Sequence, residues 1–99
     1  MADNITETIA ELITRRRRQV LVHSIIYYKL NDSLISDETW SEWALELEKL
    51  QEKYPEIAAK CPYAEAFAGF DHSSGCDLPL NDDWAYNKAL KLLQYEGKI

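Results

Sequence analysis

Residues 27–56 read YYKLNDSLISDETWSEWALELEKLQEKYPE, and this stretch decides the fold. A turn signal at Asn31-Asp32-Ser33 precedes Ser36, a favoured helix N-cap, and an acidic pair that suits the positive end of a helix dipole. Large apolar residues then recur in steps of three and four, at Trp40, Trp43, Leu47, Leu50 and Tyr54. This spacing predicts an amphipathic helix that ends near Pro55.

The residues before this stretch predict one long helix over residues 4–30. Its apolar positions have helical spacing at Ile5, Ile9, Leu12 and Ile13. Asn4 or Asp3 is the expected N-cap, with Glu7 closing a capping box on Asn4. Val20–Leu30 is apolar on more than one face, so we expect it to be the most buried element. The two helices should pack as an αα-hairpin over residues 5–57.

The remaining chain predicts a separate C-terminal part over residues 62–96. A short turn of helix is expected over Pro55–Cys61, and Pro62 should begin another short helix. A long irregular loop follows at residues 71–81, of the kind that often carries function. Asn81, Asp82 or Asp83 should cap a last helix that runs to Tyr95. Its expected inward-facing residues are Trp84, Ala85, Ala89, Leu92 and Leu93.

The predicted fold class is therefore all-α. It consists of a helical hairpin, made of a long first helix and a second helix, with a short third helix and a C-terminal helix. The 99 residues are expected to form a single helical domain.

Composition and charge narrow the classes of function. The net charge of −6 disfavours general nucleic-acid binding, because an acidic domain repels phosphates. Two cysteines do not make a disulfide framework. With neither a secretory signal nor an apolar run of membrane length in the sequence, we expect a cytoplasmic protein that does not bind membranes.

Four consecutive arginines, Arg15, Arg16, Arg17 and Arg18, stand out against the acidic background. One interpretation is a helix whose charged groups are mostly solvated, with one or two paired to glutamates. The other is a contact with an anion or with a partner molecule.

Residues 27–56 resemble the small N-terminal domain Ia of bacterial NAD-dependent DNA ligases. That domain has an aromatic pair near the end of its first helix, matched by Tyr27-Tyr28. Its second helix begins with Ile-Ser-Asp, matched without a gap by Ile35-Ser36-Asp37, and Glu46-Leu47, Leu50 and Pro55-Glu56 fall in register. The whole chain also resembles small phage and prophage proteins described as ligase-related.

The resemblance implies a pocket for the nicotinamide mononucleotide (NMN) half of NAD. Aromatic rings would stack on the cationic nicotinamide ring, and a carboxylate would accept hydrogen bonds from ribose hydroxyls. The positions implied are Tyr27, Tyr28 and Asp37, together with Trp40 and Ser41. Trp40 stands where the ligases have tyrosine, and Ser41 stands where they have a second aspartate.

Three functions follow as hypotheses. The first is a non-catalytic binding protein for NAD or NMN that requires no cofactor. The second is a phage-type accessory protein that uses the hairpin to inhibit or modulate a host enzyme or defence system. The third, an enzyme acting on a nicotinamide nucleotide, lacks an arranged nucleophile and base. Ligase activity is not expected from this chain alone, because it has no Lys-x-Asp-Gly nucleophile motif. A homodimer remains open, because the first helix is apolar around much of its second half.

Other candidate residues have simpler interpretations. His23 fits a semi-buried histidine of the apolar helix. Cys61, His72 and Cys76 match no standard zinc finger, and no metal site is expected. Cys76 as a nucleophile and the Ser73-Ser74-Gly75 turn as an anion site remain weaker alternatives. Four aspartates near the loop fit helix capping or solvation better than a cation site: Asp71, Asp77, Asp82 and Asp83.

Overall fold

The computed structural model describes residues 7–73 and 75–98, and in them the chain is entirely helical apart from turns and loops. The helices are α1 (Ile9–Tyr28), α2 (Asp37–Lys53), α3 (Pro55–Lys60) and α4 (Asp83–Tyr95). The predicted all-α fold with its hairpin and C-terminal helix is confirmed. In the described ranges, no helix is long and apolar enough to span a membrane.

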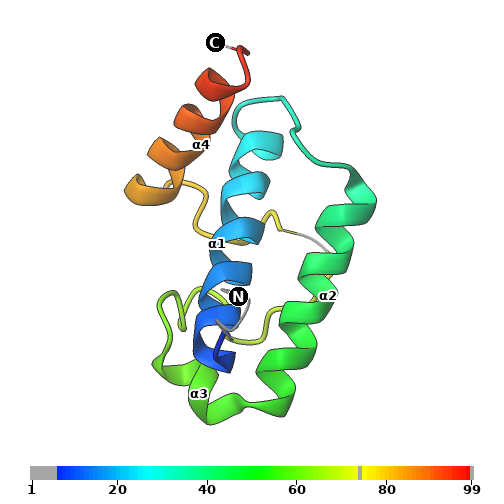
Figure 1. The fold of residues 1–99 in the computed structure, drawn as a ribbon, viewed down its shortest axis with the longest axis vertical. Helices are drawn as coiled ribbons and strands as arrows, with labels where there is room; N and C mark the ends of the chain where they lie inside the picture. The colour runs from blue at the N-terminus through cyan, green and yellow to red at the C-terminus, as the bar shows by residue number, and fades with distance from the viewer. Residues whose placement is uncertain (1–6, 74, 99) are drawn as a thin grey trace, which may run out of the picture.

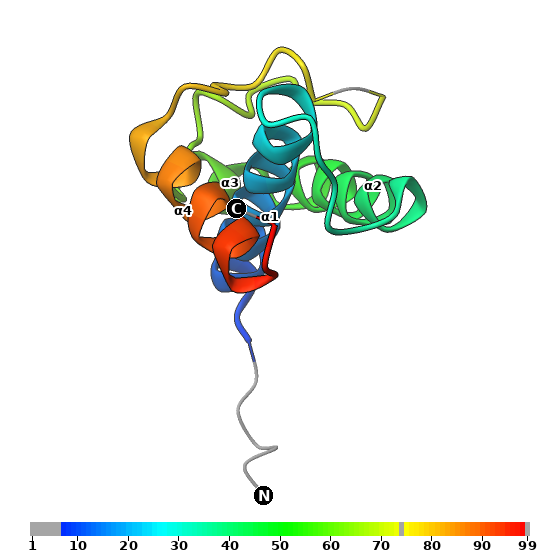
Figure 2. The ribbon, with the colours of Figure 1, turned by 90° about the horizontal axis from the view of Figure 1, so that it is seen from above.

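The long helix α1 is the centre of the molecule. Figure 1 shows α2 on one side of it and α4 on the other, and Figure 2 shows the same arrangement from above. The segment after α3, in green and yellow, returns along α1 and leads from the α2 side to α4. Within residues 7–73 and 75–98, the two outer helices α2 and α4 do not contact each other.

The second half of α1 supplies much of the core, as its apolar composition predicts. Its fully buried positions pack against small and apolar residues of α2 and α4 and against Phe67 from the intervening segment. The α1 residues with no exposed surface are Ile13, Val20, Leu21, Ile25 and Ile26.

The start of α1 differs from the prediction. The helix begins at Ile9, and Thr8 is its N-cap. The Thr8 hydroxyl accepts the Glu11 backbone N–H at 3.1 Å, and the Glu11 carboxylate accepts the Thr8 N–H at 2.8 Å. This capping box satisfies two helix-end donors, whereas Glu7 pairs with Arg15 instead of closing a box. The expected caps Asn4 and Asp3 lie outside the described residues.

Two further expectations are wrong. Residues 62–69 form consecutive turns rather than a helix, because Tyr63 has a φ of 67°, outside the right-handed helical region. The Tyr63 hydroxyl donates to the Asp82 carboxylate at 2.8 Å, which fastens these turns to the N-cap of α4. Trp84 is 46% exposed instead of inward-facing, and its ring lies 5.1 Å from the Arg18 guanidinium.

Candidate ligand pocket at the helical hairpin

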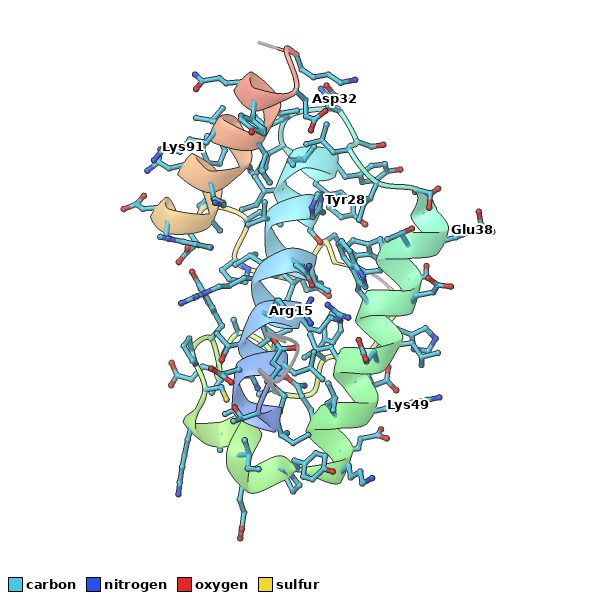
Figure 3. All side chains as sticks on the ribbon, viewed as in Figure 1. Arg15, Tyr28, Asp32, Glu38, Lys49 and Lys91 are labelled. Carbon is cyan, nitrogen blue, oxygen red and sulfur yellow. The ribbon has the colours of Figure 1, made fainter. Side chains whose placement is uncertain are left out.

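A pocket of about 220 Å³ lies where the end of α1 meets the start of α2. In Figure 3, Tyr28 marks the α1 side of this corner and Glu38 marks the first turn of α2. The connecting segment and one residue of the distant 71–81 loop complete the lining. The described lining residues are His23, Ser24, Tyr27, Tyr28, Ser33, Leu34, Ile35, Ser36, Asp37, Trp40, Ser41 and Ser73.

The structure brings all five ligand-site residues of the sequence analysis to this pocket. Tyr27 and Tyr28 come from the last turn of α1, while Asp37, Trp40 and Ser41 come from the first turns of α2. The α2 positions are spaced i, i+3 and i+4, so they share one helix face. Ser36 fixes where that face begins, because its hydroxyl accepts the Thr39 N–H at 3.0 Å and caps the helix.

The two tyrosines present aromatic surface at the pocket mouth. Their rings meet edge to face, with centroids 4.9 Å apart and planes at 85°. Tyr27 is 55% exposed and Tyr28 is 41% exposed, so both keep ring surface that a ligand can contact.

Trp40 is held more firmly than the tyrosines. Its indole Nε1 donates to the Ser24 hydroxyl at 3.2 Å and to the Val20 carbonyl at 3.4 Å. The Ser24 hydroxyl in turn donates to the Val20 carbonyl at 2.7 Å. These bonds join α2 to α1 and fix the indole ring on one side of the pocket.

The loop after residue 70 forms another side of the pocket. Ser73 lines it, and buried Gly75 packs against Ser24 and Trp40 so closely that a Cβ there would lie 2.4 Å from the Ser24 hydroxyl. The loop is also fastened to α2, because the Glu48 carboxylate accepts the His72 backbone N–H at 2.8 Å and contacts its Nδ1 at 2.8 Å. These hydrogen bonds lower the pKa of Glu48.

Sequence analysis missed His23, Ser24 and Ser73 as pocket residues. A signal for the first two was present, because they precede Tyr27 and Tyr28 by four residues and therefore share their helix face. Ser73 approaches from a distant loop through tertiary packing, so no local pattern reveals it.

His23 is partly enclosed between the pocket and Trp43, whose ring centroid lies 5.6 Å away. Its Nδ1 is buried and has no hydrogen-bond partner among the described residues. Burial disfavours the charged imidazolium, so the pKa of His23 lies below its ordinary value. The imidazole is therefore neutral at pH 7.

This lowered pKa predicts that acid destabilises the fold. Below pH 6.5 the unfolded chain protonates His23 while the folded chain does not, so stability is complete above that pH and declines as the pH falls toward the folded pKa. The slope from this group is at most about 1.4 kcal/mol per pH unit. Urea unfolding between pH 7.5 and 5 should show a steeper decline in the wild type than in His23→Gln. Identical slopes would contradict the assignment.

The four arginines do not converge on one site. Arg15 pairs with Glu7 at 2.7 Å, and Arg16 bonds to Glu46 and to Gln19. Arg17 is buried and bonds to Gln51 and to backbone carbonyls, and Arg18 lies over Trp84. None of the four lines the hairpin pocket. Contact of the run with an anion or partner stays a prediction.

The residues considered as zinc ligands make separate contacts with other parts of the protein. Cys61 is buried, and its thiol contacts the Ala10 and Ile57 carbonyls, whereas His72 pairs with Glu48. Over residues 7–73 and 75–98, no group of three or more histidine, cysteine, aspartate or glutamate side chains is placed to hold a metal ion.

Comparison with known proteins gives matches to bacterial DNA ligases. A DNA ligase of Fervidobacterium nodosum is 34% identical over 91 residues, covering 85% of this chain and 13% of the ligase. A DNA ligase of Pseudothermotoga lettingae is 40% identical over 53 residues, covering 54% of this chain and 8% of the ligase. The chain is related to part of bacterial DNA ligases.

This relationship concerns a small part of those enzymes, because the chain corresponds to about a tenth of their length. It supports the ligase resemblance of the sequence in general, without singling out domain Ia. No family model matches the chain, and no solved structure matches it.

Proposed function

We propose that this chain is a non-catalytic binding protein whose hairpin pocket takes a nicotinamide nucleotide, NAD or its NMN half. The observation that carries the proposal is the convergence of Tyr27, Tyr28, Asp37, Trp40 and Ser41 on one pocket. All five are positions that the domain-Ia resemblance implies, and they line the same space of about 220 Å³.

The chemistry of the pocket suits the nicotinamide riboside half of such a ligand. Aromatic surface from the tyrosines and Trp40 can stack on a planar ring. The Asp37 carboxylate and the Ser41 hydroxyl have no hydrogen-bond partner among the described residues, so both can bind ribose hydroxyls. The volume lies below the range of about 300–1,000 Å³ that is typical of ligand pockets, which favours half of a dinucleotide over the whole.

Calorimetric titration tests the proposal directly. Millimolar NMN and NAD should each give saturable heat with the wild-type protein. Tyr28→Ala should weaken NMN binding by about tenfold, because it removes an aromatic contact of about 1 kcal/mol together with buried apolar area.

Tyr95→Ala is the matched control, because Tyr95 is also an exposed helix-end tyrosine but does not line the pocket. It should bind NMN like the wild type, and circular dichroism should show both variants folded. An absence of binding heat with both nucleotides would refute the proposal. An equal loss in both variants would refute the assignment to this pocket.

A further inference from the structure

We propose that the pocket selects its ligand by positive charge and recognises a phosphate-free pyridinium nucleoside. Nicotinamide riboside in its oxidised, cationic form is then the preferred ligand, and the 5′-phosphate of NMN adds no affinity. This inference rests on the proposed function and specifies which part of the nucleotide the site recognises.

The charge of the lining is the first argument. Among its twelve described residues, Asp37 is the one acidic side chain, and no lysine or arginine is present. Phosphate sites in proteins are normally built with arginine, lysine or free backbone N–H groups. A phosphate in this pocket would meet a carboxylate in a protein of net charge −6.

The nearby cations do not line this pocket. Lys29, directly after Tyr28, lines a different hollow together with Asn81 and Asp83. The arginines of the run on α1 are hydrogen-bonded to Glu7, Glu46 and Gln51, and Arg18 lies over the ring of Trp84. Lys98 approaches the connecting segment, but it pairs with Asp32 at 3.7 Å. None of these positive groups lines the pocket.

The N-terminus of α2 also faces this corner, and a helix N-terminus can attract anions. Here part of that capacity is already used. The Ser36 hydroxyl accepts the Thr39 N–H, and the carboxylates of Asp37 and Glu38 occupy the first turn. A phosphate would have to compete with two covalently attached carboxylates for the same end of the dipole.

The aromatic groups favour a cation over a neutral ring. Tyr27, Tyr28 and Trp40 line the pocket, and the negative electrostatic potential of aromatic rings attracts a pyridinium. The neutral His23 imidazole adds no opposing positive charge. Reduction of the nicotinamide ring removes the charge while leaving the riboside similar in size, so it isolates this contribution.

The test compares nicotinamide riboside, reduced nicotinamide riboside and NMN by calorimetric titration. At low salt the oxidised riboside should bind about fivefold more tightly than NMN, because the phosphate is repelled by Asp37 and by the net charge of the protein. At about 0.5 M salt this ratio should approach one. The reduced riboside should bind at least about tenfold more weakly than the oxidised form.

A positive charge added to the lining provides the variant. Ser41→Lys should invert the order so that NMN binds more tightly than the riboside, whereas Ser41→Gln, similar in length but neutral, should preserve the riboside-first order. Melting curves would establish that both variants fold.

The outcomes separate the two proposals. Tighter binding of NMN than of the riboside by the wild type would overturn this inference and leave the proposed function standing. Equal binding of oxidised and reduced riboside would overturn selection by charge. No binding of any of the three ligands would refute the proposed function, and this inference with it.

Discussion

Replacing Arg17 with methionine is expected to lower the free energy of unfolding by about 2–4 kcal/mol. Arg17 is only 2% exposed, and its guanidinium donates to Gln51 Oε1 at 2.9 Å and to the Cys61 and Pro62 carbonyls at 3.2 and 3.0 Å. Methionine fills similar space but donates nothing, so these acceptors lose their partner. Relief from burying a charge offsets part of the loss, but three acceptors are left without this donor, at a cost of about 1–3 kcal/mol for each that stays unsatisfied.

Urea unfolding followed by circular dichroism measures this effect, and Arg18→Met is the matched control. Arg18 adjoins Arg17 in sequence, but its guanidinium lies over the half-exposed ring of Trp84. Losing that contact should cost no more than about 1 kcal/mol. Equal destabilisation by the two substitutions would show that Arg17 does not connect α1 to the Cys61-Pro62 turn in solution.

Gly75→Ala is expected to destabilise the protein by about 1–3 kcal/mol and to weaken nucleotide binding. The new Cβ would lie 2.4 Å from the Ser24 hydroxyl and 3.0 Å from the Trp40 ring. Both neighbours are fixed by hydrogen bonds, so the loop must move away rather than the neighbours. Its displacement would shift Ser73, which lines the pocket. Thermal melting and NMN titration report the two effects.

A substitution at a second glycine, Gly69, is the control that separates the effect of close packing from that of backbone strain. Gly69 has a φ of 71°, and a Cβ there would meet nothing within 4 Å. Gly69→Ala should therefore lower stability by about 1 kcal/mol through strain alone and leave NMN binding intact. Adding Ser24→Ala to Gly75→Ala should restore part of the binding, because it removes the closest clash. Wild-type melting and binding in Gly75→Ala would contradict the close packing of this loop.

The hairpin corner was predictable because its signals are local. The cap at Ser36, the spacing of Trp40 and Trp43, and the proline after Tyr54 each act within a few residues of the helix they define. The remaining sides of the pocket depend on contacts distant in sequence, such as Gly75 against Ser24 and Trp40. Contacts of that kind follow from tertiary packing, which no local pattern encodes.

For the arginine run, the local sequence pattern identifies which arginine is buried but not the groups that it contacts. Four consecutive helical residues point in directions about 100° apart, so they cannot share one environment. Arg17 falls on the same face as Ile13, Val20, Leu21 and Ser24, all of which are buried. Helical spacing therefore identifies Arg17 as the inward member, whereas its acceptors at Gln51, Cys61 and Pro62 required the tertiary structure.

The position of α1 between two helices that do not contact each other also constrains the order of assembly. Within the described residues, α2 and α4 each find their packing surface on α1 and not on one another. α2 also packs against α3, whereas the helix contacts of α4 are all with α1, so each of the two can dock on α1 independently of the other. The folding pathway can therefore branch at its last step, with either the pocket-bearing hairpin or the α1–α4 pair completed first.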